Sequence, residues 1–193
     1  MYKRQAQIWY TDLHHDIAHV LEESGLPPSL LCLELTESLF ADHAVAKVQG
    51  ALDSLKRLGV KLALDDFGTG YSSLGYLTKM PFSKLKIDRI FVDGIAESQS
   101  KRKLLAGMIA LGKGFGMTIV AEGAETPEEV ALLSGLGCEQ VQGYVFAKPS
   151  NAKEALAFAN RFDLESGIKA LSAYSKGAGD NNSSTKLEPS AAA

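Results

Sequence analysis

The sequence predicts an α/β protein built from repeated strand–helix units, and three observations lead to this fold class. Short apolar runs of strand length alternate along the chain with longer segments that have helical periodicity. Five such runs follow one another with a helix between each pair, which indicates parallel strands. The spacing of roughly 30 residues per unit is compatible with a (β/α) barrel and with a doubly wound sheet, and periodicity alone leaves both open.

The five expected strands are short runs dominated by Leu, Ile, Val and Ala. In chain order they cover residues 31–36, 60–64, a segment containing 85–87, residues 118–121 and residues around 140–142. The first of them, LCLELT, has the length of a buried strand. These runs therefore predict one mainly parallel sheet.

Helices are expected between and around the strands, over residues 12–24, 45–58, about 98–115, 127–135 and 152–162. In the first of them the apolar residues recur at helical spacing, Thr11 or Asp12 can cap its start, and Gly25 ends it. Pro127 suits the first turn of the fourth helix, because proline is tolerated where the backbone N–H has no partner. The helices supply the connections that parallel strands require.

The two ends of the chain differ from its middle. Residues 175–193 lack apolar periodicity and are rich in Gly, Ser, Asn and Ala, which predicts a disordered tail. MYKRQ at residues 1–5 is also what the transposase end of a sequencing library encodes, so we interpret it as a non-native start. Subtracting these 5 and 19 residues from 193 leaves 169. A complete barrel takes about 250 residues, so we expect an incomplete one, with about five of its eight strands.

Composition and charge exclude several classes of protein. The chain is 46% hydrophobic and 22% charged, with a formal net charge of −3, which excludes disorder of the whole chain. No apolar stretch approaches the roughly 20 residues of a membrane span. The acidic balance gives no electrostatic footprint for a nucleic acid polymer or an anionic membrane. The two cysteines fit a reducing compartment, so we expect a cytoplasmic location, whatever membrane or sensor domains precede this segment in a longer parent.

Acidic residues follow four successive predicted strands. In a parallel barrel the carboxyl ends of all strands meet on one face, where barrel active sites lie. Converging carboxylates repel one another, and a hard divalent cation such as Mg²⁺ or Mn²⁺ removes that conflict. The pattern favours metal-activated water attacking a phosphoryl centre, although any single acid could instead cap the following helix. From the first strand to the fifth, the acids at the strand ends, together with a nearby lysine and glutamine, are Glu34, Glu37, Asp65, Asp66, Lys86, Asp88, Glu122, Glu125 and Gln142.

A glycine-rich segment, GTGYSS, follows the second strand directly after Asp65 and Asp66. Gly68 and Gly70 allow a tight turn, and such turns sometimes bind phosphate at a helix N-terminus. No Gly-Lys-Ser/Thr sequence follows, so this is not a Walker motif. We predict a loop that positions the neighbouring acids.

At these residues the chain resembles the EAL-domain family, phosphodiesterases that hydrolyse cyclic di-GMP to linear pGpG. The resemblance covers roughly residues 7–162, so we expect a partial EAL domain over residues 6–165, and it implies a TIM-like barrel with one strand reversed. The segments that carry it are ELTES (34–38), DDFGTGYSSL (65–74), MPFSKLKIDRIFV (80–92), VAEGAET (120–126) and VQGYVFAKP (141–149).

The resemblance also implies roles for individual residues. Mg²⁺ or Mn²⁺, two ions in a complete domain, would be held by Glu34, Asp65, Asp66 and Glu122. Lys86 resembles the lysine that hydrogen-bonds the attacking water, so Lys86, Glu122 and Asp66 form the expected catalytic set. Glu37 resembles the acid that fixes the DDFGTGY loop. Further residues on the substrate side are expected to be Asp88, Glu125, Gln142, Gly143 and Tyr144.

The chain departs from the family pattern near its start. The Glu-Ala-Leu segment, which supplies one metal ligand and precedes a substrate-binding Arg, is absent. Aligning the Gln of the family's Asn-x-Ser-x-x-Gln segment with Gln7 places Arg4 and Tyr2 at its Ser and Asn positions. Because two of the family's metal ligands are missing, we expect this chain alone to hydrolyse little or no cyclic di-GMP, although the acids present favour an active parent enzyme.

Two other functions stay open beside the enzyme. Some EAL domains resemble receptors that bind cyclic di-GMP without cleaving it, usually after losing acids at the strand ends. The acids present here favour an active parent, and an intact Glu-Ala-Leu segment upstream would favour the enzyme over the receptor. A fragment that only mediates interactions is the third alternative, and it would show no nucleotide-induced rise in melting temperature. The resemblance also implies cyclic di-GMP as the ligand and a homodimer of the full-length protein.

Overall fold

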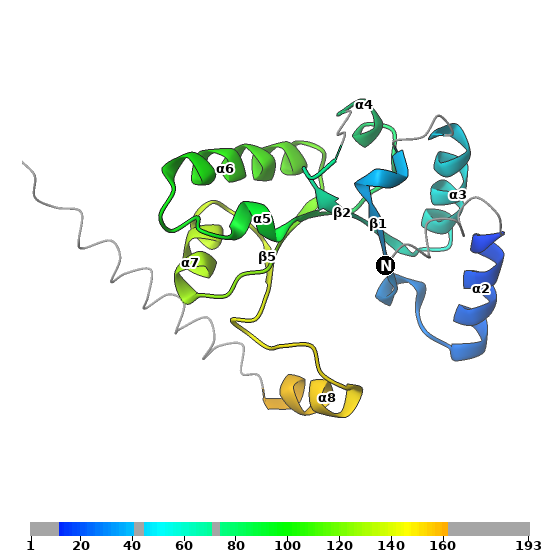
Figure 1. The fold of residues 1–193 in the computed structure, drawn as a ribbon. Coiled ribbons are helices and arrows are strands. Elements are labelled where there is room, and N and C mark those ends of the chain that lie inside the picture. The colour runs from blue at the N-terminus through cyan, green and yellow to red at the C-terminus, as the bar shows by residue number, and fades with distance from the viewer. Residues whose placement is uncertain (1–11, 41–44, 71–73, 162–193) are drawn as a thin grey trace, which may run out of the picture.

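The computed structural model describes residues 12–40, 45–70 and 74–161. The predicted non-native start, the predicted tail and the alternative cap Thr11 lie outside these residues. The described part contains a five-stranded sheet with helices around it (Figure 1). The strands are β1 (Cys32–Thr36), β2 (Lys61–Phe67), β3 (Lys84–Ile87), β4 (Thr118–Glu122) and β5 (Gln140–Gln142). The α-helices are α2 (Leu13–Ser24), α3 (Val45–Arg57), α4 (Leu74–Leu77), α5 (Arg89–Val92), α6 (Gln99–Gly114), α7 (Pro127–Gly135) and α8 (Ala152–Arg161).

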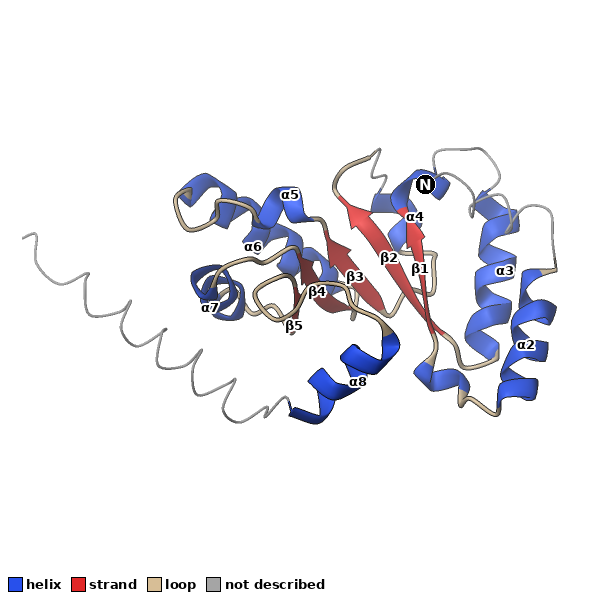
Figure 2. Ribbon diagram, turned by 60° about the horizontal axis from the view of Figure 1, so that its bottom comes forward, coloured by secondary structure: helices blue, strands red, loops and turns tan. Residues whose placement is uncertain are grey.

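The order of the strands resolves the choice that periodicity leaves open. The strands pair in the order β1-β2-β3-β4-β5, and each neighbouring pair is parallel (Figure 2). A doubly wound sheet reverses its order at a switch point, whereas a barrel adds each new strand beside the previous one. The sheet therefore has barrel order and confirms the predicted α/β class.

The two faces of the sheet have different chemistry because successive side chains of a strand point to opposite faces. On one face Leu62, Leu64, Leu85 and Ile119 are at most 1% exposed. They pack in one core with apolar residues of α3, α6 and α7. The opposite face carries polar side chains at the alternate positions, among them Glu34, Asp65, Lys84, Lys86, Glu122 and Gln142.

The elements observed agree with those expected, apart from their ends and four short helices. Strand β2 continues to Phe67 instead of ending at Leu64, because Asp65 still pairs with Thr36 of β1 after the apolar run has stopped. The periodicity also missed α4, α5 and two 3₁₀ turns at Pro28–Leu30 and Glu37–Phe40. Segments of three or four residues are too short to show a helical period.

The start of α2 differs from the expectation in its capping. Asp12 holds the N-cap position, but its side chain makes no capping hydrogen bond. Its Oδ1 lies 2.8 Å from His14 Nδ1 instead. Gly25 ends the helix as predicted, in the left-handed conformation that favours glycine (φ 66°).

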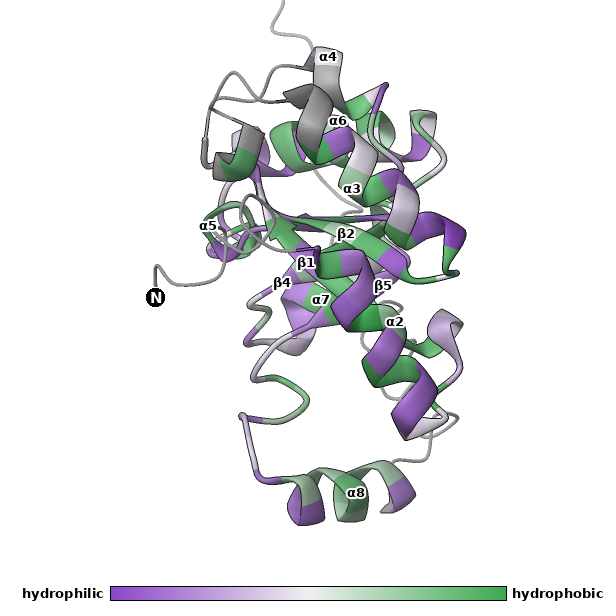
Figure 3. Ribbon diagram, turned by 90° about the vertical axis from the view of Figure 1, so that its right-hand side faces the viewer, coloured by the Kyte–Doolittle hydropathy of each residue, from purple (hydrophilic) through white to green (hydrophobic). Residues whose placement is uncertain are grey.

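Helix α8 lies apart from the sheet and from the helices that surround the sheet (Figure 3). Its residues are exposed from Ala152 to Asn160, including Leu156 at 63%. Within the described ranges, no helix has both the length and the apolar character needed to cross a membrane.

Candidate active site

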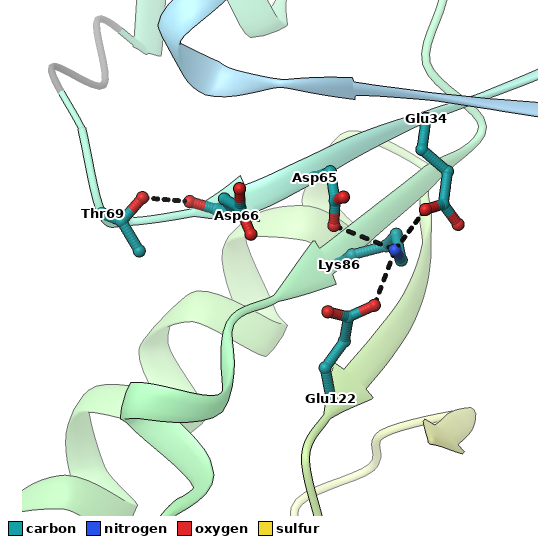
Figure 4. Close-up of polar contacts among 6 residues, drawn as sticks. All are labelled: Glu34, Asp65, Asp66, Thr69, Lys86 and Glu122. Carbon is teal, nitrogen blue, oxygen red and sulfur yellow. Dashed lines mark hydrogen bonds and ion pairs between the residues drawn. The ribbon is translucent and has the colours of Figure 1, made fainter. Parts of the chain in front are cut away.

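Three carboxylates converge on one lysine at the carboxyl ends of β1, β2, β3 and β4 (Figure 4). Lys86 Nζ lies 2.6 Å from Glu34 Oε2, 2.9 Å from Asp65 Oδ1 and 2.6 Å from Glu122 Oε1. The lysine side chain is only 7% exposed, whereas that of Glu34 is 50% exposed. The structure thus brings four of the predicted site residues into direct contact, each from a different strand.

A bulge in β2 places two consecutive acids at this end of the sheet. The pairing of β2 with β3 shifts between Leu64 and Phe67, where β2 has one more residue than β3. Asp66 within this bulge has a left-handed backbone (φ 56°), a conformation that Asp tolerates better than most residues. Bulges change the direction of side chains and often occur beside active sites. The Asp65–Asp66 pair therefore depends on an irregular strand end, with Thr69 Oγ1 donating to the Asp66 carbonyl at 2.8 Å.

Asp66 lies beside the lysine cluster and not within it. Burial, followed by repulsion from Asp65 and Asp88, raises the pKa of Asp66 above its ordinary value. Asp88 itself accepts a hydrogen bond from Ile90 N at 2.8 Å and caps α5. The capping alternative is thus correct for Asp88, which nevertheless remains an electrostatic neighbour of Asp66.

Burial and the contacts between Lys86 and the carboxylates have opposite effects on the pKa values of the cluster. Burial by itself would lower the pKa of the Lys86 ammonium, but its contacts with Glu122, Glu34 and Asp65 outweigh burial and raise that pKa. Burial raises the pKa of Glu122, and the contact with Lys86 offsets this only in part. The lysine is therefore charged at neutral pH, surrounded by carboxylates that outnumber it.

Glu37 fixes the glycine-rich loop after β2. Its side chain is buried, and its Oε2 accepts hydrogen bonds from Gly68 N at 3.0 Å and Gly70 N at 3.2 Å. Gly68 has a φ of 93°, and a Cβ there would lie 2.9 Å from Phe91 and Met108. Glycine is needed at this turn for its backbone conformation and for its lack of a side chain. The structure thus shows Glu37 in contact with this loop, and the role that the family resemblance implies for Glu37 stays a prediction.

The remaining predicted residues lie on the loops around the cluster. Glu125 is half-exposed, and its Oε1 lies 2.8 Å from Arg89 Nη2. Sequence reasoning missed Arg89 as a partner, although it directly follows Asp88 in the LKIDR segment. Tyr144 is 52% exposed, with Lys148 Nζ 5.7 Å from the centre of its ring.

Gln142 and Gly143 lie at the edge of the sheet, where the loop after β5 meets the loop after β4. They line an open hollow of about 340 Å³ together with Phe158 of α8. Ala124 N donates to the Gln142 carbonyl at 3.2 Å, and a Cβ on Gly143 would lie 2.0 Å from the Ala124 carbonyl oxygen. Gly143 therefore serves the close packing of these two loops.

The side chains present fit a divalent cation. Asp65 Oδ1 and Glu122 Oε1 are buried and lack a partner at hydrogen-bond geometry among the described residues, although Lys86 lies within ion-pair distance of both. The short distances are charge contacts, and both oxygens keep acceptor capacity for a further partner. Carboxylate oxygens are the ligands that Mg²⁺, Mn²⁺ and Ca²⁺ prefer. The candidate ligands are Glu34, Asp65, Glu122 and, beside them, Asp66.

Comparison with known proteins identifies the domain. The sequence model of the EAL domain matches residues 4–149. The chain belongs to the EAL domain family. A relative from Pseudomonas aeruginosa, the cyclic di-GMP phosphodiesterase NbdA, is 40% identical over 158 residues, which are 81% of this chain and 20% of the relative. The protein sll1895 of Synechocystis is 42% identical over 147 residues, or 76% of this chain and 21% of the relative. The matched part of this chain thus spans about a fifth of the length of each of these relatives.

Solved EAL structures show the same fold. The EAL domain of Mycobacterium smegmatis DcpA has a TM-score of 0.77 and 35% identity, covering 81% of this chain and 70% of that one. The PaMucR phosphodiesterase in complex with c-di-GMP has a TM-score of 0.73 and 37% identity, with 78% and 61% covered. Klebsiella pneumoniae BlrP1, solved with manganese and cyclic di-GMP, has a TM-score of 0.69 and 33% identity, with 75% and 37% covered. The five-stranded sheet is accordingly a partial TIM-like barrel.

Proposed function

We propose that this chain carries the larger part of a metal-dependent site for the hydrolysis of cyclic di-GMP to linear pGpG. One observation carries the proposal: Glu34, Asp65 and Glu122 converge on Lys86 at the carboxyl ends of parallel strands. The names of relatives such as NbdA and PaMucR support the substrate. The BlrP1 complexes with manganese and with calcium support a divalent cation.

Each residue of the site has a definite task in this proposal. Glu34, Asp65, Asp66 and Glu122 would hold Mg²⁺ or Mn²⁺, with two ions in a complete domain. When bound, the metal supplies an activated water and neutralises charge on the phosphodiester. Lys86 would hydrogen-bond the attacking water from within the acid cluster, and Glu122 and Asp66 would be the acids that take up its proton.

The surrounding residues position the loops and the substrate. Glu37 holds the loop at Gly68 and Gly70, so that Asp65 and Asp66 keep their places at the strand end. The substrate side is formed by Asp88, Glu125, Gln142, Gly143 and Tyr144. We place the protein in the cytoplasm, with residues 6–165 as its EAL portion and a homodimer as the state of the full-length protein.

The chain by itself is expected to bind ligands better than it turns them over, because it lacks a Glu-Ala-Leu segment and has Tyr2 where the family has an Asn. The alternative function is a receptor that binds cyclic di-GMP without cleaving it. The four acids and Lys86 at the strand ends favour the enzyme, since a receptor needs no metal ligands.

Binding and turnover can be measured on the same preparation of the 193-residue chain. We expect Mn²⁺ to bind in calorimetry, cyclic di-GMP to raise the melting temperature when Mn²⁺ is present, and chromatography to detect little or no pGpG. Asp65→Asn should abolish Mn²⁺ binding, whereas Glu22→Gln on the exposed side of α2 should leave it unchanged. Absence of Mn²⁺ binding to the unaltered chain would contradict the metal site, and rapid formation of pGpG would contradict the expected inactivity.

A further inference from the structure

The ammonium group of Lys86 occupies the point at which the carboxylates of the cluster meet. It lies within 2.9 Å of an oxygen from each of three acids, and these acids come from β1, β2 and β4 on both sides of its own strand. The lysine side chain is 7% exposed. A single buried positive charge thus holds three negative groups together on one face of the sheet.

The oxygens that contact the ammonium are the ones best suited to a cation. Asp65 Oδ1 and Glu122 Oε1 are both buried, and Lys86 is the cation that lies within ion-pair distance of both. A metal ion that uses these oxygens has to replace the ammonium on at least one of them. Even where it uses the other oxygen of a carboxylate, it meets the repulsion of a positive charge a few ångströms away.

We propose that Lys86 is a tethered counter-ion that keeps the acid cluster assembled without metal and competes with a divalent cation for its carboxylates. This inference rests on the proposed function, because it assigns a regulatory role to a residue of the same site. Lys86 therefore lowers the affinity for the cation and sets a threshold concentration for loading. Once the cation has taken its oxygens, the released ammonium is available to other groups in the site.

Lys86→Met tests this role, because methionine retains a long apolar stem without the charge. Calorimetric titration of the full chain with Mn²⁺ should show binding at least about tenfold tighter in the variant than in the unaltered protein, since a nearby positive charge has been removed. Without metal, the melting temperature of the variant should fall, because three carboxylates have lost their counter-ion. Saturating Mn²⁺ should then raise it by more than it raises that of the unaltered chain.

Lys84→Met is the matched control. Lys84 precedes Lys86 by two residues on the same strand and face, and its Nζ contacts Gln140 Oε1 at 3.0 Å instead of the acids. Its loss should change Mn²⁺ affinity less than about twofold, because its charge lies outside the cluster. A gain as large as that of Lys86→Met would mean that any lysine on this face acts through general charge, and would overturn the proposal.

A second pair of variants keeps the test decisive if Lys86→Met does not fold. Glu34→Gln and the double variant Glu34→Gln/Lys86→Met differ only at the lysine, and the double variant has one fewer unpaired carboxylate than Lys86→Met alone. Tighter Mn²⁺ binding in the double variant supports the proposal. Equal or weaker binding in either comparison overturns it while leaving the metal site intact, because the lysine would then organise the ligands without competing. Absence of Mn²⁺ binding in every chain overturns the proposed metal function together with this inference.

Discussion

The two faces of the sheet are made by the same strands and yet have opposite physical roles. On the face toward α3, α6 and α7, residues such as Leu64, Leu85 and Ile87 are completely buried in one apolar core. On the other face, the neighbouring positions carry Asp65 and Lys86 in a cluster of charges. Parallel strands that are covered by helices on both sides have nearly continuous apolar sequences. Alternation of apolar and polar residues in a parallel strand therefore indicates that one face of the sheet is not packed against helices.

This difference separates stability from function along each strand. Burial of apolar side chains stabilises the fold in proportion to the area removed from water. Buried, converging carboxylates do the reverse, because burial first and repulsion from neighbouring acids after it raise the pKa of both Glu122 and Asp66. The apolar core on the helix-facing side contributes the stability that offsets this cost.

The largest expected effect is on the helix-facing side. Leu85→Ala removes a side chain that is 0% exposed, and we expect it to lower the free energy of unfolding by about 2–5 kcal/mol, through lost burial and the cavity left behind. Lys84→Met, on the neighbouring position of the same strand but the opposite face, should change it by less than about 0.5 kcal/mol. Urea denaturation of both variants checks this. Equal losses would show that the two faces do not divide their roles in this way.

An intermediate effect is expected where the two roles meet, at Glu37. This buried acid accepts hydrogen bonds from the backbone of Gly68 and Gly70, so Glu37→Ala leaves two donors without that partner. We expect a loss of about 2 kcal/mol in the free energy of unfolding. Amide hydrogen exchange at Gly68 and Gly70 should become faster as well, whereas exchange in β3 should change less.

Glu22→Ala provides the control for this loss, since Glu22 is exposed on α2. Its unfolding free energy should stay within about 0.5 kcal/mol of that of the unaltered chain. Unchanged exchange at Gly68 in the Glu37 variant would mean that the loop is held by other contacts.

The sequence is informative about each face for a different reason. Hydrophobic runs predicted all five strands, because residues such as Leu85 and Ile119 must be apolar to pack against helices. Acids at strand ends predicted the cluster, because parallel strands bring their carboxyl ends together. Neither pattern indicated the bulge at Asp66 or the pairing of Arg89 with Glu125. These depend on register and on long side chains that meet only in the folded chain.

The position of Lys86 shows the same limit. The spacing LKID predicts a lysine near the acids, but it does not predict that one ammonium contacts three carboxylates at once. That contact requires Glu34 to reach from β1 past β2, which sequence separation cannot reveal. Strand-end chemistry was thus predictable from the sequence, whereas the geometry of its charges was not.

The smallest expected effect is a gain in stability on the charged face, from Asp66→Asn. Burial, and then repulsion from Asp65 and Asp88, raises the pKa of Asp66, so its ionised form is disfavoured in the folded protein. An acid whose pKa is higher in the folded than in the unfolded state destabilises the fold above the folded pKa, and this cost disappears as the pH falls below the unfolded value. Asn removes the charge and adopts the left-handed backbone of this position as readily as Asp does.

We therefore expect Asp66→Asn to raise the free energy of unfolding at neutral pH by no more than about 0.5 kcal/mol, because Asp66 is only partly buried and solvent still screens its charge. The gain should shrink as the pH is lowered toward the ordinary pKa of an aspartate. Urea denaturation at several pH values measures it, with Glu22→Gln as an exposed control that shows no such trend. A loss of stability at neutral pH would mean that the Asp66 carboxylate stabilises the fold. In that case the charged face would contribute to stability as well as to function, and the division between the two faces would not hold at this position.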